Sequence, residues 1–102
     1  MTLTSKERAE LRAEAHHLTA LVHVGQHGLT PAIISTLDDA LRTHELVKVA
    51  LAKSTEVSAK DAAHELAQSL NADVVQTIGR TCTLYRENPD IERKQGAAPP
   101  WR

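Results

Sequence analysis

A four-residue stretch, Gly25-Gln26-His27-Gly28, lies between a short apolar run and a helix-start pattern. Because glycine has no β-carbon, such a stretch either takes up positive φ in a tight turn or lets a phosphate backbone approach its amides. The spacing alone favours the turn, since short glycine motifs are common. A nucleotide site is the weaker interpretation, because the third glycine of a dinucleotide turn and the Gly-Lys-Ser/Thr of a P-loop are missing.

The residues that follow limit how a helix end could bind an anion here. Pro31 has no amide hydrogen, and the Thr30 hydroxyl is expected to accept a hydrogen bond from the amide of Ala32 or Ile33. The remaining donors are then the amides of residues 26–28. We therefore expect loop amides, more than the helix terminus, to carry any contact with phosphate.

The sequence gives less support for metal binding or catalysis. Four histidines fall within twelve residues, at His16, His17, His23 and His27. Adjacent residues point about 100° apart on a helix, and no Cys or His pair has the spacing of a structural zinc site, so we expect no metal. His27 could act as a general base, but no second acid or base stands at a determinable distance, so we expect no enzyme and no cofactor. The alternation around Cys82 predicts an ordinary strand residue.

Three helices are predicted from capping patterns. The first runs from Thr4 to about His17, the second begins at Pro31, and the third opens at Ser58 and stops near Asn71. In the second helix, Asp38, Asp39 and Arg42 are expected to face water. The apolar positions expected in the core are Leu11, Ala15 and Leu18, then Ile34, Leu37 and Leu41, then Ala59, Ala62, Ala63, Leu66 and Leu70.

Strand-forming runs alternate with these helices. They occupy residues 20–24, the segment 44–53, and two runs within 72–87 that Gly79 and Arg80 separate as a hairpin turn. The order is α-β-α-β-α-β-β, which predicts a four-stranded mixed sheet packed with three helices. Each strand-helix-strand unit implies parallel neighbours, and the final hairpin adds an antiparallel strand.

Composition fits one small domain. The chain has 102 residues, 41% of them hydrophobic, which suits a single compact α/β domain over residues 2–86. Residues 87–102 collect Pro, Gly and charge and are expected to form a flexible tail, with Trp101 incidental in it. A net charge of −1 does not predict nucleic-acid binding by itself. The charged N-terminus and the absence of a long apolar run favour a cytoplasmic protein.

Four motifs in order, "AHHL", "VGQHGLT", "ALRTHELVKV" and "GRTCTLYR", give the chain a wider resemblance. From about Leu3 to Arg86 it resembles the YhbY-like CRM domain, the chloroplast RNA splicing and ribosome maturation module. The resemblance implies a compact α/β domain that binds structured RNA with a KH-like Gly-x-x-Gly loop between the first strand and the second helix. Bacterial stand-alone members associate with precursors of the large ribosomal subunit.

The resemblance also implies the site residues. RNA-binding positions carried over are Gly25, Gln26, His27 and Gly28 as the loop, with Arg42, Lys48, Arg80 and Arg86 as basic residues in matching segments. Family loops often have a basic residue between the glycines, where this chain has Gln26 and His27. We expect a monomeric, non-enzymatic assembly factor that binds ribosomal RNA on large-subunit precursors. The alternative is a protein-protein interaction module, which near-neutral charge and only two aromatic residues favour.

Overall fold

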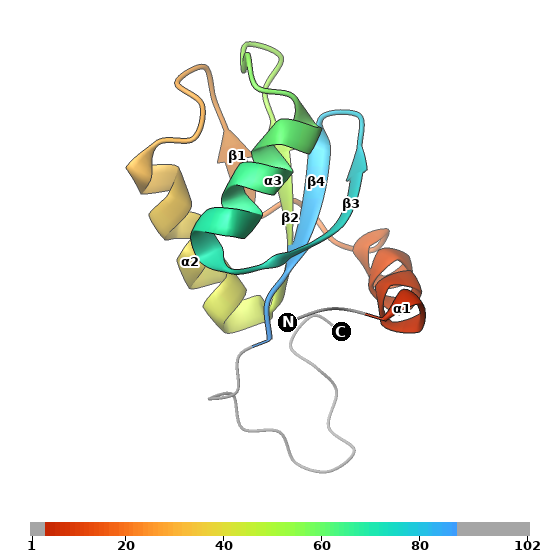
Figure 1. Cartoon of the computed structure of the whole chain (residues 1–102). Coiled ribbons are helices and arrows are strands. Elements are labelled where there is room, and N and C mark those ends of the chain that lie inside the picture. The colour runs from red at the N-terminus through yellow and green to blue at the C-terminus, as the bar shows by residue number, and fades with distance from the viewer. Residues whose placement is uncertain (1–3, 88–102) are drawn as a thin grey trace.

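A four-stranded sheet with helices on both faces forms the centre of the computed structural model, which describes residues 4–87 (Figure 1). Its elements are α1 (Ser5–Ala15), β1 (Val22–Val24), α2 (Pro31–His44), β2 (Leu46–Leu51), α3 (Ala59–Leu70), β3 (Asp73–Ile78) and β4 (Thr81–Tyr85). The predicted α/β class and element order are confirmed. Apart from Glu87, the predicted tail and Trp101 lie outside the described residues.

The predicted helix caps are confirmed. Thr4, Thr30 and Ser58 accept hydrogen bonds from the backbone amides of Glu7, Ile33 and Asp61 at 3.1, 3.2 and 3.1 Å. Glu7 completes the capping box by accepting from the Thr4 amide, and its hydrogen bonds with Thr4 lower the pKa of the Glu7 carboxyl. Asn71 ends α3 in the left-handed region, at φ 54°. No helix within residues 4–87 has both the length and the apolarity needed to cross a bilayer.

The strand order is β1-β2-β4-β3. β1 pairs with β2 in parallel, as predicted, but the prediction that β3 lies beside β2 is wrong, because β4 lies between them and is antiparallel to both. Burial gives the reason. The middle of β4, at Cys82, Thr83 and Leu84, is buried, whereas β3 ends in the exposed Thr77 and Ile78 and can therefore tolerate an edge.

Different helices pack on the two faces of the sheet. α2 and α3 pack on one face, over Val47 and Val49 of β2 (Figure 1). On the other face α1 covers one end of the sheet, where Leu11 packs with Leu46 and Val75. The rest of that face includes Lys48 and Ala50 of β2, paired with Thr83 and Thr81 of β4.

Cys82 is an ordinary strand residue, as predicted. Its side chain is buried on β4 among the core residues under α2 and α3. Burial raises the pKa of the Cys82 thiol to about 11, because the thiolate is disfavoured away from water.

Candidate functional site

The stretch from Gly25 to Gly28 forms a tight turn between β1 and α2. The Gly28 amide donates to the Gly25 carbonyl at 3.0 Å and closes the turn. Gly28 has φ 70°, a conformation that side chains with a β-carbon rarely adopt. Gly25 lies outside that region, and a β-carbon built on it would meet nothing within 4 Å. Turn geometry thus accounts for the glycine at Gly28 but not for the one at Gly25.

Hydrogen bonding leaves the two central amides of this turn, those of Gln26 and His27, available within the described residues. The expectation that the Gly28 amide is a free donor is wrong, because that amide closes the turn. The Thr30 hydroxyl accepts from the Ile33 amide, as expected. Within the described part of the chain, the amides of Gln26 and His27 make no hydrogen bond, and both residues are exposed. Unpaired amides in a turn are suitable donors to an anion.

A second turn lies against the first. It runs from Ala52 to Thr55, just after β2, and the Thr55 amide closes it by donating to the Ala52 carbonyl at 3.0 Å. The buried Thr55 hydroxyl lies 2.9 Å from the Gly25 carbonyl and 3.0 Å from the Val24 carbonyl, with one proton to share between them. Sequence reasoning missed Thr55, since a threonine in a polar loop carries no periodic pattern that would identify it.

The structure does not bring the predicted basic residues together at one place. Arg80, in the β3–β4 hairpin, lies beside the second turn, with its Nη1 3.4 Å from the Ala52 carbonyl. Lys48 lies midway on the sheet, where its half-buried side chain reaches to 3.4 Å from the Ala15 carbonyl at the end of α1. Arg42 lies eleven residues after Pro31, about 16 Å along α2 at 1.5 Å per residue. Arg42 is therefore far from the glycine turn.

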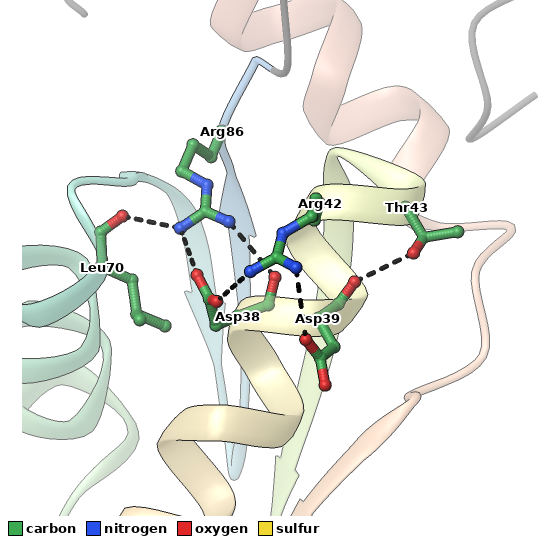
Figure 2. Close-up of polar contacts among 6 residues, drawn as sticks. All are labelled: Asp38, Asp39, Arg42, Thr43, Leu70 and Arg86. Atoms are coloured by element: carbon green, nitrogen blue, oxygen red, sulfur yellow. Dashed lines mark hydrogen bonds and ion pairs between the residues drawn. The ribbon is translucent and has the colours of Figure 1, made fainter. Parts of the chain in front are cut away.

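Arg86 joins α2 to α3 at that far end (Figure 2). Its Nη1 donates to Asp38 Oδ1 at 2.8 Å and to the Leu70 carbonyl at 3.0 Å, and its Nη2 donates to the Asp38 carbonyl at 3.1 Å. The Arg86 side chain is only 22% exposed. These contacts give Arg86 a structural role, and its predicted contact with RNA stays a prediction.

Asp38 accepts from two arginines and its side chain is 32% exposed, so it faces water only in part. Arg42 Nη2 lies 2.7 Å from Asp38 Oδ2, and Arg42 Nη1 lies 3.8 Å from Asp39 Oδ1 (Figure 2). The hydrogen bond from Arg86 is the largest cause that lowers the pKa of the Asp38 carboxyl, with the charges of both arginines adding to it. Asp39 and Arg42 are exposed, as expected.

Within residues 4–87, no three His, Cys, Asp or Glu side chains lie close enough together to hold a metal ion. His16 and His17 are exposed, and the first lies at the end of α1. His27 is in the glycine turn and His23 is on β1. The glycine turn, the second turn and Arg80 lie at one end of the sheet, which we call the loop end. Backbone amides and a cationic side chain at this end are suited to binding an anion.

Comparisons with known proteins agree with this fold. The family model of the CRS1 / YhbY (CRM) domain matches residues 3–86. The chain is 38% identical over 88 residues to the probable RNA-binding protein YqeI of Bacillus subtilis, covering 86% of this chain and 92% of that protein. A probable RNA-binding protein of Pseudomonas aeruginosa is 35% identical over 89 residues, 87% of this chain and 86% of its own length.

A solved structure is also similar. The solution structure of a Staphylococcus aureus protein has a TM-score of 0.68 and 31% sequence identity, and the match covers 96% of this chain and all of that one. An α/β domain with three helices and a four-stranded mixed sheet is therefore common to this chain and its relative.

Proposed function

Because the chain belongs to the CRS1 / YhbY (CRM) domain family, we propose that it binds RNA, with the turn from Gly25 to Gly28 in contact with the phosphate backbone. The relatives described above are named for RNA binding and not for a reaction, and this chain is not an enzyme. The proposed partner is ribosomal RNA on precursors of the large subunit. The protein would act there as a monomeric assembly factor in the cytoplasm.

Gly25 is the observation that supports this function most directly. Neither its φ nor any neighbouring atom requires glycine, so the missing β-carbon has no use within the fold. The missing β-carbon would instead let a phosphate come close to the amides of Gln26 and His27, which are unpaired among residues 4–87. Contacts to phosphate and ribose also suit a chain with few aromatic residues for base stacking.

Replacing Gly25 by Ala tests the proposal. The added β-carbon meets open space, so the free energy of unfolding should stay the same or rise by up to about 1 kcal/mol, because alanine restricts the unfolded chain. RNA affinity should fall about tenfold or more, the equivalent of one lost charge-assisted hydrogen bond. Filter binding to in vitro-transcribed large-subunit ribosomal RNA measures the affinity, and urea unfolding of the same preparation measures the stability.

Gly28→Asp provides a second test with a different physical cause. Asp tolerates left-handed φ better than most residues, so folding should lose about 1 kcal/mol or less. The new carboxylate should repel phosphate and abolish most binding. If both variants fold and bind RNA as the parent does, the glycine turn does not contact phosphate and the proposed contact is wrong.

Sedimentation in a ribosome gradient tests the choice of partner. A tagged copy should migrate with large-subunit precursors, and the Gly28→Asp variant should move to the top of the gradient. If the parent stays at the top while purified protein still binds RNA, another RNA is the partner. If it neither migrates with precursors nor binds RNA, the protein-protein interaction module is the better interpretation.

A further inference from the structure

Two turns meet at the end of β1. The first is closed between Gly25 and Gly28, the second between Ala52 and Thr55, and each closing hydrogen bond measures 3.0 Å. The second turn is held by both of its ends, one against β1 and the other against the junction of β1 and the first turn. The Ala52 amide donates to the Val24 carbonyl at 2.9 Å, and the Thr55 hydroxyl reaches the carbonyls of Val24 and Gly25.

Lys53 occupies the outer part of the second turn. Lys53 and Ser54 are its two central residues, and both are exposed. Because Ala52 and Thr55 are held against β1, the backbone on either side of Lys53 is fixed relative to the glycine turn. Arg80 reaches the Ala52 carbonyl from the neighbouring hairpin and adds a second cation to the same end of the sheet. Glu56, exposed just beyond the turn, carries the opposing charge.

We propose that the turn from Ala52 to Thr55 is a second RNA-contacting element, in which Lys53 binds phosphate and Thr55 is a positioning residue that holds the two turns together. This inference rests on the proposed function of the glycine turn. One stretch of RNA backbone would contact the amides of Gln26 and His27 and, a neighbouring phosphate away, the Lys53 ammonium. Holding both turns before binding reduces the ordering that RNA would otherwise have to impose.

Lys53→Gln tests the phosphate contact. RNA affinity at about 0.1 M salt should fall roughly three- to tenfold, and the slope of log affinity against log salt should become shallower by about 0.7, the value of one contact to single-stranded RNA. Lys6→Gln is the matched control, because it also removes one positive charge from an exposed lysine. Lys6 lies in the first turn of α1, and α1 packs against the end of the sheet that is opposite the two turns. Parental affinity and slope for Lys53→Gln would overturn the contact.

Thr55→Val and Thr55→Ser test the positioning role. Valine keeps the shape of the side chain and removes the hydroxyl, so affinity for the same ribosomal RNA should fall at least threefold. Serine keeps the hydroxyl and should restore most of the binding. Urea unfolding identifies conditions in which all three proteins are folded, and binding is measured there. A folded Thr55→Val protein that binds as the parent does would overturn the role of Thr55.

Gly25→Ala separates failure of this inference from failure of the function on which it rests. If Gly25→Ala weakens binding but Lys53→Gln and Thr55→Val do not, the glycine turn contacts RNA and the second turn does not. If none of the three variants changes binding, the glycine turn itself is not the RNA site.

Discussion

Arg86 should be one of the main contributors to stability outside the apolar core, and Arg86→Gln tests this. The guanidinium makes three hydrogen bonds, one of them to the Asp38 carboxylate, and it joins α2 to the end of α3 (Figure 2). A hydrogen bond to a charged group contributes about 1.5–3 kcal/mol and a neutral one about 0.5–1.5 kcal/mol. Both side chains of the pair keep some exposure, 22% and 32%, so values at the low end apply.

The sum predicts a loss of about 2–3 kcal/mol in the free energy of unfolding for Arg86→Gln. In a domain of this size such a loss lowers the melting temperature by roughly 10–20 °C. Arg42→Gln is the control, since Arg42 is 61% exposed and its ion pair with Asp38 is an i,i+4 pair expected to contribute about 0.5 kcal/mol or less. Urea unfolding followed by circular dichroism measures both variants.

The dependence of stability on acid pH gives a second test of the contact between Arg86 and Asp38. The pKa of Asp38 is lowered in the folded protein, so the carboxylate adds stability above its unfolded pKa near 4, and this stability is lost as pH falls through the folded value. In Arg86→Gln that acid-dependent loss should be smaller than in the parent. If the variant stays within about 0.5 kcal/mol of the parent at pH 7, the three hydrogen bonds only replace equivalent bonds to water, and the reasoning fails.

A further prediction concerns the single cysteine. Because burial raises the pKa of Cys82 to about 11, a thiol reagent at pH 8 should label native protein at least a hundredfold more slowly than urea-unfolded protein, and equal rates would contradict its buried position.

Local patterns were sufficient to predict most of the elements. An N-cap such as Thr30 acts on an amide three residues away, and Pro31 fixes its own backbone, so the information lies within one helical turn of sequence. Strand geometry with period two likewise predicts Val47 and Val49 on one face of β2 and Lys48 on the other, and both valines lie in the core.

Long-range contacts could not be predicted in this way. The order of the strands depends on which hairpin strand gains more burial, and β4 took the central position. Arg86 meets Asp38 across 48 residues, and Thr55 meets Gly25 across 30. An arginine after a strand and a threonine in a loop look like solvated residues in sequence. Their partners become visible only when the strands and helices are in place.

The distribution of charge explains how a chain with a net charge of −1 could still bind phosphate, and it ranks the variants. At the far end of the sheet, ion pairs with Asp38 offset part of the positive charge of Arg42 and Arg86. At the loop end, Lys53 and Arg80 are offset in part by Glu56, so charge alone gives only a modest attraction. The close approach at Gly25 should then matter more than any one cation, and Gly25→Ala should weaken RNA binding more than Lys53→Gln. The reverse order in the same filter-binding series would show that cationic side chains, rather than the open turn, dominate the contact.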